Sequence, residues 1–110
     1  MSGSDLFTGT LDILILNSLR AGPSHGYAIG RRLRERSEGV LDVEEGALYP
    51  ALHRLEGRGL LRASWAKTET GRRAKFYRLT PDGEALWERL SERWRVFSGA
   101  VNQVIREAEG

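Results

Sequence analysis

Three basic residues, Arg72, Arg73 and Lys75, lie close together in a segment that reads as the tip and second strand of a β-hairpin. Cationic side chains on such a ribbon can contact nucleic-acid phosphates. The hairpin directly follows an amphipathic helix that begins near Gly46. A short helix before a basic ribbon can place one element in the major groove of DNA and the other at the flanking phosphates. The alternative is an ordinary solvated, charged surface.

The distribution of charge supports a polyanionic partner more than the net charge does. The 110 residues carry a formal net charge of only +2. Residues 45–80 contain eight Lys/Arg and three Asp/Glu, a net +5, whereas residues 1–44 and 81–110 carry −1 and −2. Positive charge concentrated in one stretch steers a polyanion toward one face.

The composition excludes several other functions. The chain has no cysteine, which rules out disulfides and Cys-ligated metals, and only two histidines. No Gly-rich phosphate loop and no evident pair of catalytic carboxylates is present. We therefore expect no enzyme activity, no catalytic residue, no metal and no cofactor. The sequence has no secretory signal and no apolar run that could cross a bilayer, so we expect a cytoplasmic protein without a membrane partner.

Two helices are predicted before the basic stretch. The first opens at Thr8–Gly9–Thr10 after a loose tail over Met1–Asp5, and runs to about Arg20; it is apolar nearly all round, so it belongs in the core. Gly22–Pro23 ends it. The second spans His25–Ser37, with Ser24 as its expected N-cap. Its predicted buried residues are Tyr27, Ile29 and Leu33.

The third helix is predicted from about Gly46 to Gly59, with Pro50 limiting how early it can begin without a kink. Helical spacing places an apolar set on one face: Leu48, Ala51, Leu52 and Leu55. The other positions carry polar or small residues: Gly46, Tyr49, Pro50, His53, Arg54 and Gly57. This pattern suits a helix whose outer side contacts DNA, although an ordinary surface helix has the same pattern.

Strands are predicted at Leu60–Lys67 and Arg73–Leu79, joined by a turn over residues 68–72. A two-stranded ribbon is marginal alone, so it must pack on the helices. We expect Trp65 and Phe76 to serve this packing rather than to stack on bases; the role of Tyr77 stays open.

A long final helix begins at Thr80–Pro81–Asp82, where a capping hydroxyl, a first-turn proline and an acid follow one another. Its apolar residues recur at alternating steps of three and four: Trp87, Leu90, Trp94, Phe97, Val101, Val104 and Ala108. About 27 residues would extend roughly 40 Å. An exposed apolar stripe of this length indicates that a partner helix covers it. We therefore predict a homodimer, the alternative being a stripe folded back as core.

Together these elements predict a mostly α, α+β fold. Residues 1–80 would form a winged helix-turn-helix DNA-binding domain, and residues 81–110 a C-terminal dimerisation helix.

Four segments resemble the PadR family of bacterial transcriptional regulators. They read GTLDILIL (9–16), GPSHGYAI (22–29), EEGALYPALHRLEGRGLL (44–61) and GRRAKFYRLTPDG (71–83). The resemblance covers nearly the whole chain and points to the compact subgroup with one C-terminal helix. It implies a winged helix-turn-helix, a homodimer built on the last helix, and binding to palindromic promoter sites in duplex DNA, usually as a repressor.

The resemblance also implies which residues contact DNA. Tyr49, Pro50, His53 and Arg54 occupy recognition-helix positions. Arg72, Arg73 and Lys75 occupy the wing. His25 and Tyr27 begin the second helix, where a structural role is at least as well supported as a DNA contact.

Compact members of the family often sense small aromatic compounds at the dimer interface. Trp87, Trp94 and Phe97 could line such a pocket, or could simply fill the dimer core. The main alternative function is a winged-helix protein-interaction module without DNA binding, which would have no need of the basic wing. RNA binding would favour exposed stacking aromatics over a recognition helix.

Overall fold

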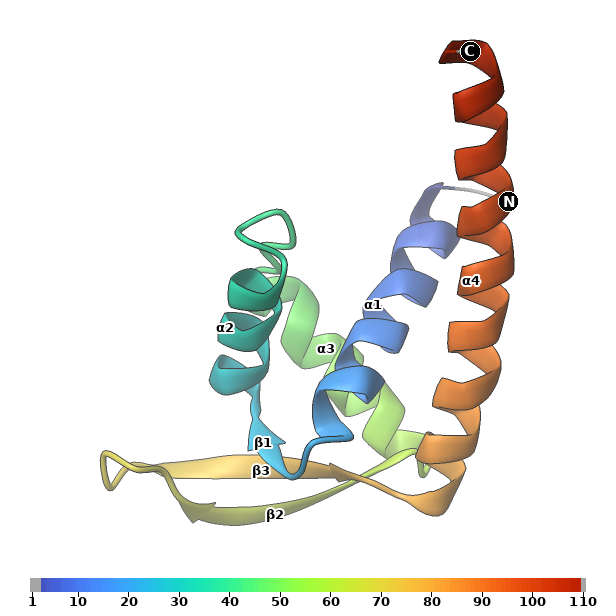
Figure 1. Cartoon of the computed structure of the whole chain (residues 1–110). Coiled ribbons are helices and arrows are strands. Elements are labelled where there is room, and N and C mark those ends of the chain that lie inside the picture. Colours follow the sequence, from blue (N-terminus) through green and yellow to red (C-terminus); the bar gives the residue numbers. More distant parts are fainter. Residues whose placement is uncertain (1–2, 110) are drawn as a thin grey trace.

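The computed structural model describes residues 3–109, with side chains over 9–108. Four helices accompany a small sheet: α1 (Gly3–Leu19), α2 (Gly26–Arg36), α3 (Glu45–Gly57) and α4 (Pro81–Glu109). The strands are β1 (Ser24–His25), β2 (Leu61–Lys67) and β3 (Arg73–Leu79), antiparallel in the order β1-β3-β2. The sheet lies at one end of the helices, and α4 runs beside α1 (Figure 1). This arrangement is the predicted winged helix-turn-helix with a long C-terminal helix.

The core is built from one face of each of the first three helices. Its fully buried large side chains are Ile15, Leu16, Ile29, Leu48, Leu52 and Leu55. The predicted apolar face of α3 is therefore confirmed. Burying a Leu or Ile side chain contributes roughly 1.5–3 kcal/mol, so these contacts hold α1, α2 and α3 against one another.

The predicted start of the first helix was wrong, whereas that of the third was confirmed to within one residue. α1 begins at Gly3, because a glycine inside a helix costs only about 1 kcal/mol and Gly9 does not stop it. Of the predicted tail, Gly3–Asp5 are helical, while Met1 and Ser2 lie outside the described residues. α3 begins at Glu45, ahead of Pro50. Proline removes only the hydrogen bond to the carbonyl of Gly46, and the buried leucine face holds the helix.

The start of α2 also differs from the prediction. Ser24 and His25 form a third strand, opposite Tyr77 and Phe76 of β3. The N-cap is consequently His25, whose Nδ1 accepts a hydrogen bond from the N–H of Ala28 at 3.3 Å. Tyr27 is 58% exposed rather than buried, because it points away from the side of α2 that carries Ile29 and Leu33.

The hairpin of β2 and β3 follows the predicted strands to within one residue and is called the wing (residues 61–79) below. Its turn is closed by hydrogen bonds between Thr68 and Arg72, with Gly71 in the left-handed region at φ 85°. Leu61 and Tyr77 are buried at its base. Phe76 packs edge-on against His25 at 5.1 Å, as expected of a packing residue. Trp65, in contrast, is exposed, so its predicted packing on the helices was wrong.

The predicted cap of α4 is confirmed. The Thr80 hydroxyl accepts from the N–H of Gly83 at 3.1 Å and donates to the carbonyl of Gly59 at 2.7 Å. The backbone of Gly83 lies directly against the carbonyl oxygen of Leu60, where a Cβ would collide. These contacts fix the first turn of α4 to the end of α3 and the base of the wing.

The apolar stripe of α4 divides into two parts. Trp87 and Leu90 pack against the core of their own domain, beside the buried Leu86. Beyond them, Trp94, Phe97, Val101 and Val104 are exposed. Within the described part of the chain, no helix combines the length and apolar character needed to cross a membrane.

We predict that Gly83→Ala destabilises the fold by about 1–3 kcal/mol, because the added methyl group meets a backbone oxygen that cannot rotate away. Chemical denaturation measures the change. Gly57→Ala is the matched control, since a Cβ at this other helical glycine meets only open space. Its stability should be unchanged or slightly raised. Equal effects of the two substitutions would contradict the contact.

Candidate nucleic-acid interface

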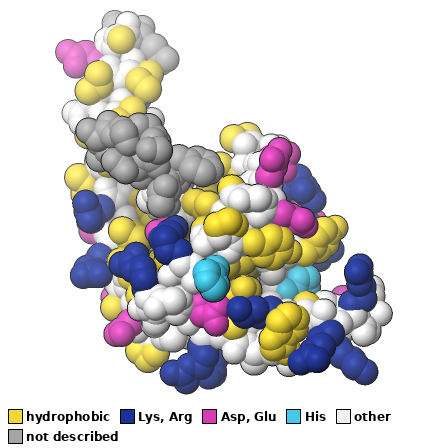
Figure 2. All heavy atoms as spheres, turned by 180° about the vertical axis from the view of Figure 1, so that it is seen from behind, with side chains coloured by type: hydrophobic (Ala, Val, Ile, Leu, Met, Phe, Trp, Pro, Cys, Tyr) yellow, Lys and Arg dark blue, Asp and Glu magenta, His cyan; other side chains and the backbone are white. Residues whose placement is uncertain are grey.

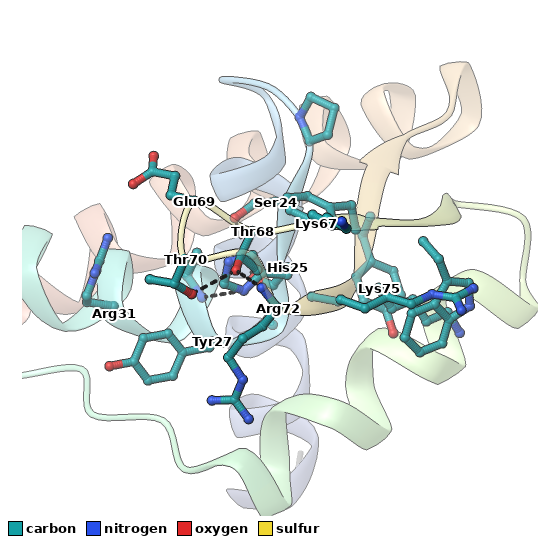
Figure 3. A pocket seen from close by; sticks show the side chains of 18 of the residues that line it. Ser24, His25, Tyr27, Arg31, Lys67, Thr68, Glu69, Thr70, Arg72 and Lys75 are labelled. Atoms are coloured by element: carbon teal, nitrogen blue, oxygen red, sulfur yellow. Dashed lines mark hydrogen bonds between the residues drawn. The ribbon is translucent and has the colours of Figure 1, made fainter.

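An open groove of about 1040 Å³ separates the wing from the start of α2 (Figure 3). One side is formed by His25, Tyr27 and Arg31, and the other by wing residues that include Trp65 and Lys75. Tyr49 of α3 lines the same groove. The structure therefore brings together residues from three predicted DNA-binding segments.

The outer side of α3 is accessible along its length. Tyr49, Pro50 and His53 are all exposed, opposite the buried leucines. The ring of Tyr49 lies over Gly26, where a Cβ would come within 2.5 Å of its Cε1 atom. Partial burial, and secondly the Glu45 carboxylate, raises the pKa of Tyr49, so the phenol stays protonated at neutral pH. Gly26 thus lets α2 and α3 approach closely, a contact that the sequence analysis missed.

His25 has a structural role in addition to any contact with DNA. Its Nδ1 caps α2, and its ring stacks on Tyr27 with the centroids 6.5 Å apart and meets Phe76 edge-on. Tyr27, at the start of α2, lines the groove (Figure 3).

Arg54 makes a different contact from the predicted one. Its guanidinium donates two hydrogen bonds to the carboxylate of Asp12 on α1, at 2.6 and 3.1 Å. The Asp12 side chain is nearly buried, and its hydrogen bonds raise the pKa of Arg54 further. A bidentate pair of this kind fixes orientation as well as charge. It joins α3 to α1, and a DNA contact by Arg54 stays a prediction.

The basic residues of the wing differ in their surroundings. Arg72 and Arg73 are exposed at the tip. Lys75 donates a hydrogen bond from Nζ to Oε1 of Glu56 at 2.9 Å, which raises its pKa and ties the wing to α3. Viewed from behind, the molecule gathers Lys and Arg side chains at its lower right, where the wing lies (Figure 2). The tip therefore carries exposed cations, whereas Lys75 is held by a carboxylate.

This fold and surface define a winged helix-turn-helix protein of the DNA-binding class. Residues 15–89 match the model of the transcriptional regulator PadR-like family, and the chain belongs to that family. It is therefore a DNA-binding transcriptional regulator; the family consists of regulators rather than enzymes.

Two relatives and two solved structures illustrate the similarity. An uncharacterized protein of Lysinibacillus sphaericus is 30% identical over 94 residues, which cover 86% of each chain. A transcriptional regulator of Mycobacterium tuberculosis is 51% identical over 63 residues, 57% of this chain and 55% of that protein.

A transcriptional regulator from Clostridium thermocellum superimposes with a TM-score of 0.80 at 31% identity, covering 90% of this chain and 96% of the other. A PadR family regulator from Clostridium difficile gives 0.74 at 34% identity, covering 86% and 97%.

We predict that Arg54→Ala destabilises the protein by about 2–3 kcal/mol, because it leaves the nearly buried Asp12 carboxylate without its partner. Arg95→Ala provides the matched control: it breaks an exposed ion pair with Glu92 and should cost less than about 1 kcal/mol. Denaturant titration of both variants measures the difference. The double variant Asp12→Ala/Arg54→Ala should lose clearly less stability than the two single variants lose in sum. A loss equal to that sum would show that the two side chains do not interact.

Proposed function

We propose that this regulator acts as a homodimer joined through α4 and represses transcription by occupying palindromic promoter sites. The exposed stripe of α4 carries this proposal. Trp94 is 40% exposed and Phe97 43% exposed, and Val101, Val104 and Ile105 continue the same apolar surface. The C-terminal end of α4 extends beyond α1, α2 and α3 (Figure 1), so none of these helices covers that end of the stripe. The α4 helix of a second copy would bury it.

A two-fold dimer would present two copies of α3 and two wings to one side of the duplex. The exposed face of α3, with Tyr49, Pro50 and His53, would read base edges in the major groove. Arg72 and Arg73 would contact phosphates beside it, with His25 and Tyr27 at the start of α2 near the backbone. Half-sites would lie about 34–36 Å apart, or a multiple of that distance. The proposal of repression rests on the resemblance to the PadR family, whose members usually act as repressors.

We predict that Trp94→Glu yields a monomer that has lost most of its operator affinity. A carboxylate in the middle of the stripe would be buried at the interface without a partner. Sedimentation velocity measures the mass, and a gel shift measures binding. Val96→Glu is the control, since Val96 is also exposed on α4 but lies off the stripe, and it should stay dimeric. If the Trp94→Glu protein is still a dimer, the dimer interface lies elsewhere on the molecule.

The same residues support a small aromatic effector. The rings of Trp94 and Phe97 lie 6.1 Å apart at 38°, and their symmetry mates would join them at the two-fold axis. A planar compound between paired indoles would quench tryptophan emission saturably, near one molecule per dimer. Trp94→Ala tests whether these rings bind effector or only fill the interface: a dimer with unchanged quenching and DNA release would exclude an effector site here.

We predict that Arg72→Ala/Arg73→Ala weakens binding to operator and random duplexes alike, because phosphate contacts carry no sequence information. Each lost contact should reduce the slope of log K against log salt by about 0.9. Arg89→Ala/Arg106→Ala removes the same charge from α4 and should keep the slope. An unchanged slope in the wing variant would mean that the tip does not touch phosphate.

A further inference from the structure

Trp65 is an exposed aromatic residue that neither the core nor the proposed dimer explains. Its side chain is 60% exposed on β2, within the wing. An indole side chain contributes most to stability or binding when it is removed from water. Exposed indoles are therefore typical of binding surfaces. We therefore infer that this exposed ring, beside the candidate nucleic-acid interface, contacts a ligand.

The strand register shows what surrounds this indole. Residues directly opposite each other in an antiparallel pair share one face of the ribbon. On this face the pairs Leu61–Leu79 and Ala63–Tyr77 lie toward the core. Farther out, the pairs are Trp65–Lys75 and Lys67–Arg73. One continuous face thus changes from packed core to an indole flanked by three cations.

The same face looks toward the proposed DNA-binding side of α3. Trp65 and Lys75 line the groove that Tyr49 also lines. The hydrogen bond from Lys75 to Glu56 holds this part of the wing against α3. A duplex seated on Tyr49 would therefore lie within reach of the indole, which moves with α3 rather than independently of it.

The guanidinium of Arg73 lies over the Trp65 ring, 5.2 Å from its centroid. With one ring face covered by a cation, the indole cannot insert between two stacked bases, which requires both faces. The ring, 60% exposed, can pack against a deoxyribose wall instead. Deoxyribose walls line the minor groove, where apolar side chains beside cations are a recurrent combination.

We propose that Trp65 packs into the minor groove beside each half-site while Arg73 neutralises the adjacent phosphate. The 2-amino group of guanine projects from the floor of this groove, so the indole fits A·T flanks and is blocked by G·C flanks. The inference rests on the proposed DNA binding by α3 and the wing, and assigns the reading of the flanking sequence to Trp65.

The test uses the full chain and duplexes carrying the site that it recovers from a random-sequence pool. The base pairs beneath the wing are made A·T, G·C or inosine·C; inosine lacks the 2-amino group but keeps a G·C-like major groove. Wild-type protein should bind the A·T and inosine·C duplexes about tenfold more tightly than the G·C duplex. Trp65→Ala should lose this preference, and Trp65→Phe should keep part of it.

Arg62→Ala is the matched control, because Arg62 pairs with Arg78 on the opposite face of the wing. It should retain the flank preference. Addition of A·T duplex should also quench tryptophan emission in the wild type more than in Trp65→Phe, which isolates Trp65 from Trp87 and Trp94. Thermal denaturation should show equal stability for all four proteins.

Three results would overturn the inference while leaving DNA binding intact: a flank preference that survives Trp65→Ala, an inosine·C duplex that binds as weakly as G·C, or equal quenching by single-stranded DNA. The last would indicate stacking on unpaired bases. Failure of the wild-type chain to bind any duplex would instead refute the proposed function itself.

Discussion

The ion pair between Asp12 and Arg54 sets the position of α3, on which the proposed DNA-binding surface depends. The leucine face of α3 supplies most of the burial, but hydrophobic contacts are non-directional. The bidentate pair adds direction, because both carboxylate oxygens of Asp12 are engaged by one planar guanidinium. With the inner side of α3 fixed against α1 in this way, Tyr49, Pro50 and His53 face outward together.

Much of the fold could be predicted because local signals and burial agree. The 3.6-residue spacing of Leu48, Leu52 and Leu55 defined the buried face of α3, and Thr80–Pro81 defined the start of α4. The short strand at Ser24–His25 could not be predicted, since its pairing with β3 brings together residues about fifty positions apart. Its formation uses Ser24 in the sheet and so transfers the cap of α2 to His25.

The candidate site was predictable in outline but not in its contacts. Charge clustering located the wing, yet nothing local indicates that Lys75 bonds to Glu56, or that Arg54 faces a carboxylate on α1. Trp65 was misassigned because aromatic residues in a hairpin usually pack. The signal that could have corrected this was positional: Trp65 lies near the tip, beyond the part of the ribbon that the helices cover.

The junction between Leu60 and Gly83 has a mechanical consequence. A helix that leaves a domain through a tight backbone contact and a shared threonine hydroxyl behaves as a rigid lever arm, not as a tethered rod. Its direction relative to α3 is then a fixed angle. In an assembly joined through two such helices, the distance between the two copies of α3 is set at this junction. A small rotation there produces a large displacement at the far end of the 29-residue α4.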